Sequence, residues 1–267
     1  MAHHFLENYD TALQILEEYR KFQTPSGYDF EFSEFLLYQN MVLREAGEME
    51  KALEHLREAN KFICDPVSFM QIEAEILVQL SRKEEAAEIY RELIERNPEN
   101  VAYFSKLEFC LDLTKEGAEE KRFKLYQQIL SQDSRASAPQ RIPLTFLKGA
   151  RFVEMLKPYL LNGMRKGIPS LFQCVKNLYG DPEKIQIIQK QVLTWAESLE
   201  ANERILDEGS GETSAECPTT ILWVYYFLAQ HFDQQGDYRK ALTFVDKALG
   251  HTPTLIELLL TKAKILK

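Results

Sequence analysis

The feature that most constrains this chain is a repeat of about 34 residues, clearest between Leu222 and Pro253. A repeat of this period can be built from two antiparallel helices that meet through small residues at fixed places and end near a proline. The seventh, eighth, eleventh, fifteenth, seventeenth, twentieth, twenty-seventh and thirty-second places are Leu228, Ala229, Phe232, Gly236, Tyr238, Ala241, Ala248 and Pro253. This spacing predicts a tetratricopeptide repeat.

Each of these residue types is expected to have a structural role in the repeat. Ala229 and Ala241 carry only a methyl group, so we expect the two helices to come closest there. We expect Phe232 and Tyr238 to fill the space beside them, because their rings are large. Gly236 suits the turn between the helices, and Pro253 suits the end of the second helix.

The first half of the chain repeats the same register. One repeat has small or apolar residues at Ala52, Leu56 and Ala59 after a turn at Gly47, and the next follows 34 residues later. That next repeat carries Ala74, Leu77, Ala86, Tyr90, Leu93 and Pro98 at matching places. Before them, residues 4–24 resemble the second helix of a repeat, and residues 98–132 predict a further helical pair with a longer turn.

One place in this first half departs from the pattern. The eighth place of the second repeat is Asn40, where a small residue is usual. Either the two helices lie further apart there, or the amide is hydrogen-bonded in the groove.

The repeat pattern is weak between residues 134 and 217. A polar linker at 134–138 is followed by predicted helices at 152–161, 170–178 and 182–203, the last with Pro182 at its first position. Residues 206–216 are polar and acidic and predict a mobile surface loop. Residues 218–267 return to the repeat, and 255–267 form the first helix of another.

These patterns predict an all-α fold, a single right-handed tetratricopeptide-repeat solenoid over residues 1–267. Regular repeats at 1–133 and 218–267 flank the degenerate region. Both ends interrupt a repeat, whereas natural arrays usually end in polar caps. We therefore interpret the sequence as a fragment of a longer array.

The composition also restricts the class of protein to which the chain can belong. No apolar run approaches 18 residues and no signal sequence opens the chain, which predicts a cytoplasmic protein outside the membrane. The four cysteines, Cys64, Cys110, Cys174 and Cys217, lie far apart without paired spacing, so we expect reduced thiols. The formal net charge of -9 argues against direct nucleic-acid binding by this segment.

The sequence contains no pattern that predicts catalysis. Phosphate-binding glycine loops, zinc-binding histidine pairs and nucleophile elbows are all missing. We expect His55, His231 and His251 to be structural or surface residues, and the acidic clusters to be solvated helix faces. The basic groups at Arg165–Lys166 and 121–124 could bind an anion, although such groups are common on surfaces. We predict no catalytic residue, metal or cofactor.

The concave surface of the strong repeat remains as the candidate site. In tetratricopeptide arrays this groove is lined by the second, fifth, ninth and twelfth places of each first helix, here Trp223, Tyr226, Gln230 and Asp233. Exposed tryptophan and tyrosine suit partner binding because they bury a large area at a small entropic cost. The alternative is that neighbouring helices cover the two rings.

Several longer runs point to one family. They are LLYQNMVLREAG with KALEHL (36–56), ERNPEN (95–100), RIPLTFL (141–147), PTTILWVYYFLAQHFD (218–233) and TPTLIELLLTKAKILK (252–267). With these runs the chain resembles the auxiliary, non-catalytic large subunit of the N-terminal acetyltransferase A complex. Because the runs include the degenerate middle, the resemblance is specific.

The resemblance implies a scaffold whose longer solenoid wraps the catalytic acetyltransferase subunit, shapes its active site and holds it at the ribosome. It also implies that the family's ribosome-contacting basic surfaces and its inositol phosphate site lie largely outside this segment or at its edge. The family loop is not matched between Leu206 and Glu216, so no function is carried over there.

Two other functions compete with the scaffold. A co-chaperone adaptor that grips an acidic C-terminal peptide needs Lys and Asn at groove places five and nine. This chain has Leu37 and Met41 in one repeat, and Tyr226 and Gln230 in another. An enzyme on a helical solenoid would need a convergent site, for which the sequence gives no sign.

Overall fold

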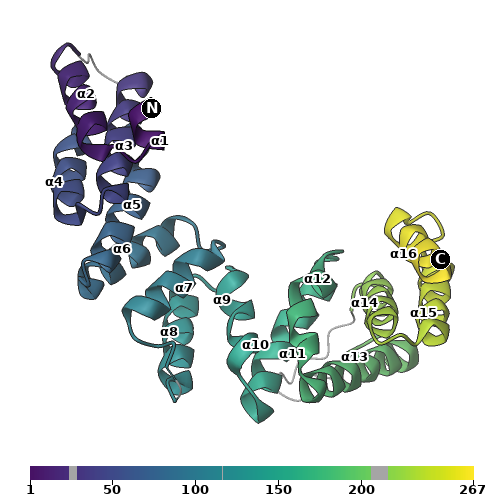
Figure 1. Cartoon of the computed structure of the whole chain (residues 1–267). Helices are drawn as coiled ribbons and strands as arrows, with labels where there is room; N and C mark the ends of the chain where they lie inside the picture. Colours follow the sequence, from purple (N-terminus) through teal and green to yellow (C-terminus); the bar gives the residue numbers. More distant parts are fainter. Residues whose placement is uncertain (24–28, 116, 206–215) are drawn as a thin grey trace. The chain divides into compact units, whose positions relative to one another are not determined.

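The structure is a computed structural model that describes residues 1–23, 29–115, 117–205 and 216–267 (Figure 1). The regular secondary structure of these residues is entirely helical. Of the predicted loop at 206–216, only Glu216 lies within the described residues. The chain divides into two compact units, unit 1 (Met1–Gln128 and Asp133–Ala138) and unit 2 (Ile129–Gln132 and Pro139–Lys267). The predicted change from regular to degenerate repeats lies a few residues from this division.

The first half of the chain consists of short helices. They are α1 (Ala2–Phe5), α2 (Tyr9–Lys21), α3 (Phe30–Glu45), α4 (Met49–Ala59), the 3-10 helix η1 (Asn60–Phe62), α5 (Pro66–Gln79), α6 (Lys83–Arg96), α7 (Val101–Cys110) and α8 (Glu119–Gln132). The pairs α3–α4 and α5–α6 correspond to the two predicted repeats, which confirms a tetratricopeptide-repeat fold of antiparallel helix pairs.

The second half contains both short and long helices. They are α9 (Ala138–Arg141), α10 (Pro143–Phe146), α11 (Gly149–Arg165), α12 (Leu171–Val175), the 3-10 helix η2 (Lys176–Gly180), α13 (Pro182–Asn202), α14 (Thr220–Gln234), α15 (Tyr238–His251) and α16 (Ile256–Leu266). The three helices predicted in the degenerate region are confirmed as α11, α12 with η2, and α13. Pro182 occupies the first turn of α13, and Asp181 caps it by accepting a hydrogen bond from the Glu183 amide at 3.0 Å.

The same turn joins the two helices of several pairs. The fifteenth-place residues Gly47, Ser81 and Gly236 have positive φ angles of 81°, 60° and 76°. In the last pair the Asp237 amide donates to the Phe232 carbonyl at 3.0 Å, and the Glu48 and Arg82 amides make the equivalent bonds. This is the Schellman ending of a helix, which favours glycine because the left-handed conformation crowds a Cβ. The turn predicted at Gly236 is confirmed.

The small residues lie where the helices of a pair approach. Ala52, Ala74, Ala86, Ala229 and Ala241 are fully buried. Phe232 is buried beside this contact and stacks on Phe244, with ring centroids 5.6 Å apart. The expectation for Tyr238 is wrong, because its side chain is 56% exposed. Tyr238 is the first residue of α15, and the ring that stacks on Phe232 belongs to Phe244, farther along the same helix.

Asn40 is hydrogen-bonded, as the second alternative expected, but between the two helices of its pair and not in the groove. Its side chain is fully buried, and its Nδ2 donates to the Ala52 carbonyl on the partner helix at 2.7 Å. The amide therefore joins α3 to α4 at the place where most repeats carry a small residue.

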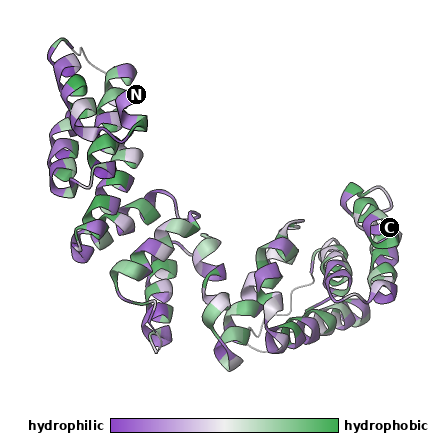
Figure 2. Ribbon diagram, viewed as in Figure 1, coloured by the Kyte–Doolittle hydropathy of each residue, from purple (hydrophilic) through white to green (hydrophobic). Residues whose placement is uncertain are grey.

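Both units have the surface pattern of packed helices. Figure 2 shows hydrophobic and hydrophilic positions interleaved along the helices of each unit, as expected for elements with one buried face. Among the described helices, none is both long and apolar enough to cross a membrane.

The degenerate pair α11–α12 keeps the turn but changes the contact. Gly167 has a φ of 64°, and the Ile168 amide donates to the Gly163 carbonyl at 3.1 Å, as in the regular pairs. A Cβ on Gly163 would lie 2.5 Å from a methyl carbon of Leu171. Gly163 is therefore where α11 and the start of α12 come close.

Candidate functional site

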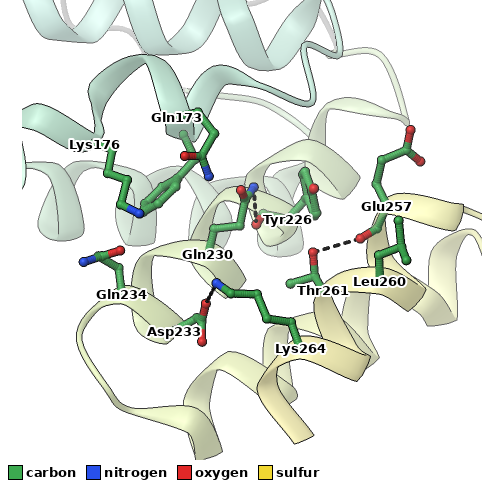
Figure 3. A pocket seen from close by; sticks show the side chains of 11 residues that line it. Gln173, Lys176, Tyr226, Gln230, Asp233, Gln234, Glu257, Leu260, Thr261 and Lys264 are labelled. Atoms are coloured by element: carbon green, nitrogen blue, oxygen red, sulfur yellow. Dashed lines mark hydrogen bonds and ion pairs between the residues drawn. The ribbon is translucent and has the colours of Figure 1, made fainter. Parts of the chain in front are cut away.

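Unit 2 contains a hollow of about 280 Å³ between α14, α16 and the wall formed by α12 and η2 (Figure 3). Tyr226, Gln230 and Asp233 line it from the fifth, ninth and twelfth places of α14. Glu257, Leu260 and Lys264 line it from the second, fifth and ninth places of α16, 34 residues after Trp223, Tyr226 and Gln230. The hollow is therefore the concave groove of two successive repeats, and we call it the α14–α16 groove.

The degenerate region supplies one wall of this groove, through Phe172, Gln173 and Lys176. The buried Phe172 ring packs edge-on against Tyr179 and Phe227, with centroid distances of 5.2 Å and 5.5 Å. Because Phe227 belongs to α14, these aromatic contacts hold the wall against the helix that forms the groove floor.

A buried histidine also ties the wall in place. His231 on α14 is fully buried, with Nδ1 2.6 Å from the Tyr179 hydroxyl and Nε2 3.1 Å from Gln189 Oε1. Burial lowers the pKa of His231 to about 4, so the ring is neutral near pH 7. In the tautomer that satisfies both contacts, Nδ1 accepts from the tyrosine and Nε2 donates to the glutamine. One side chain thus connects α14 to η2 and α13.

The charged groups of the groove are unequally paired. Asp233 and Lys264 form an ion pair at 2.6 Å that joins α14 to α16 (Figure 3). Gln230 lines the groove and donates a long hydrogen bond of 3.4 Å to the Tyr226 carbonyl. Lys176 on the wall is exposed and forms no ion pair with any described residue. Amide, hydroxyl and charged side chains therefore share the lining with the apolar Phe172 and Leu260.

The four predicted site residues divide into two groups. Tyr226, Gln230 and Asp233 line the groove, whereas Trp223 is half-buried against the α11–α12 turn. A Cβ on Gly167 would lie 2.7 Å from the Trp223 indole nitrogen, and the Trp223 and Tyr226 rings meet edge-on at 5.9 Å. Only 9% of Tyr226 is exposed. The α11–α12 turn therefore covers part of the Trp223 ring, and Tyr226 is almost buried at the edge of the groove that it lines.

Sequence reasoning missed most of the remaining lining. The 34-residue spacing would have found Glu257, Leu260 and Lys264, because they follow the α14 groove places by one repeat. No comparable signal marks Gln173 and Lys176, which lie in the degenerate region.

The other residues considered for chemistry have structural partners. His55 is buried with Nε2 3.2 Å from Gln39 Oε1, and burial, helped by the charge of Arg20, lowers its pKa to about 4. His251 is exposed at the end of α15. Both fit the expected structural or surface role, as does His231.

The basic groups proposed as anion sites are partly neutralised by carboxylates. Arg122 donates two hydrogen bonds to Glu108, at 2.9 Å and 2.8 Å, and Arg165 forms an ion pair with Glu216. Among the described residues, no three His, Cys, Asp or Glu side chains are grouped to hold a metal ion.

Comparison with known proteins gives consistent matches. The family model for "N-terminal acetyltransferase A, auxiliary subunit" matches residues 30–267. The chain is 44% identical over 269 residues to the human protein N-alpha-acetyltransferase 16, NatA auxiliary subunit. It is 36% identical over 279 residues to the Arabidopsis thaliana N-terminal acetyltransferase A complex auxiliary subunit NAA15. These matches cover 100% of this chain but only 31% and 30% of the two relatives.

A solved structure gives the same result in three dimensions. A chain in the structure of Naa15/Naa10 bound to HypK-THB matches with a TM-score of 0.85 and 34% identity. The match covers 99% of this chain and 39% of that chain.

Proposed function

Because the chain belongs to the family of auxiliary subunits of N-terminal acetyltransferase A, we propose that it is part of a non-catalytic scaffold that binds and positions the catalytic acetyltransferase subunit. The observation that carries the proposal is the match, at a TM-score of 0.85, to a chain in a structure that contains Naa15 and Naa10 together. The full-length complex would then acetylate protein N-termini at the ribosome in the cytoplasm.

The α14–α16 groove is the part of this segment that we propose for the contact. It is concave, it is lined by amide groups of Gln173, Gln230 and Gln234, and Leu260 is 66% exposed beside them. Trp223 and Tyr226 support the groove floor, while Gln230 and Asp233 meet the partner.

The surfaces for the ribosome and for an inositol phosphate belong, in this proposal, to other parts of the full-length protein. In unit 2 the exposed guanidinium of Arg165 is held by Glu216, which reduces its attraction for a phosphate.

The test uses the full-length protein that carries this segment, together with its catalytic subunit. Gln230→Arg places a longer, charged side chain in the groove, and we expect it to weaken binding on the order of ten-fold, or ~1.4 kcal/mol. Gln186→Arg is the matched control, because Gln186 is exposed on α13 outside the groove. Equal affinity of both variants, measured by calorimetry, would remove the groove from the interface. A catalytic subunit that does not bind the full-length protein at all would refute the scaffold.

A further inference from the structure

We draw no further inference here: the strongest candidate, the apolar surface that Ile256, Leu259 and Leu266 expose on α16 outside the α14–α16 groove, carries none because nothing in the structure shows what covers it.

Discussion

The helix pairs α14–α15 and α11–α12 contain the same turn, but the contacts between their two helices differ. Both first helices end with a left-handed glycine, Gly236 or Gly167, followed by the same backbone hydrogen bond. Counted from that glycine, the eighth and twentieth places of the regular pair are Ala229 and Ala241. In the degenerate pair these places carry Leu160 and Phe172, and Gly163 takes over the close approach.

This exchange of residues changes the length and the packing of the second helix. In the regular pair α15 runs for 14 residues against α14, whereas α12 runs for five residues before η2 begins. The Phe172 ring is too large for a backbone contact, and it packs instead against Tyr179 and Phe227. The repeat register can thus persist without its consensus residues, provided that some position lacks a side chain where the helices meet. The shortened second helix becomes the wall of a groove.

Removing the ring that holds this wall should have the largest effect. Phe172→Ala deletes a buried ring and should lower the free energy of unfolding by about 3–5 kcal/mol. Hydrogen exchange should accelerate most at residues 171–180. Phe109→Ala, at a ring that is 45% exposed, is the control and should cost much less. Similar losses in the two variants, measured by chemical denaturation, would mean that Phe172 does not hold the wall.

Acidification should destabilise unit 2 through His231. Its folded pKa of about 4 lies below the ordinary value of 6.5, so the unfolded chain binds a proton first as the pH falls. The contribution is complete above pH 6.5 and is lost toward pH 4, at ~1.4 kcal/mol per unit and up to about 3 kcal/mol.

Denaturation at a series of pH values would measure this slope, and His231→Gln should reduce it. His55→Gln tests the same effect in unit 1, where the folded pKa of His55 is also about 4. His251→Gln is the control, because that ring is exposed. An unchanged slope in His231→Gln would show that this histidine does not titrate differently in the folded chain.

A larger residue at the contact of the regular pair should lower the stability of the chain. Ala241→Leu places extra carbons where Ala241 is fully buried between α14 and α15, and should cost about 1–3 kcal/mol. Ala263→Leu changes an exposed alanine at the eighth place of α16 and should stay within about 0.5 kcal/mol of the parent. Equal melting of Ala241→Leu and the parent would contradict the assigned register.

The smallest effect should come from the turn that the regular pairs α5–α6 and α14–α15 share. Ser81 has a φ of 60° at the place where Gly236 has 76°. Ser81→Gly relieves left-handed strain and should stabilise the chain by about 0.5–1 kcal/mol, less than the full strain because glycine gains entropy when unfolded. Gly236→Ser should destabilise it by a similar amount, since nothing lies within 4 Å of the added Cβ and only the backbone is strained. Melting temperatures that move in the opposite directions would refute the shared turn.

The sequence by itself determined the helical register, the turn at Gly236, the buried contact at Ala241 and the start of α13 at Pro182. The turn depends on the backbone freedom of glycine, the buried contact on the small size of alanine, and the helix start on the ring of proline. These effects act within a turn or between adjacent helices. The same register also placed Gln230 and Asp233 in the groove.

Only the tertiary structure decided what covers Trp223, what fills the space assigned to Tyr238 and which wall closes the groove. Trp223 is covered because Gly167, far earlier in the chain, leaves room for its indole. Lys176 lies at the groove in η2, and this 3-10 helix is held against α14 by the hydrogen bond between Tyr179 and His231. Such contacts join residues that no short-range pattern relates, and their energy depends on the shape of the surfaces that meet.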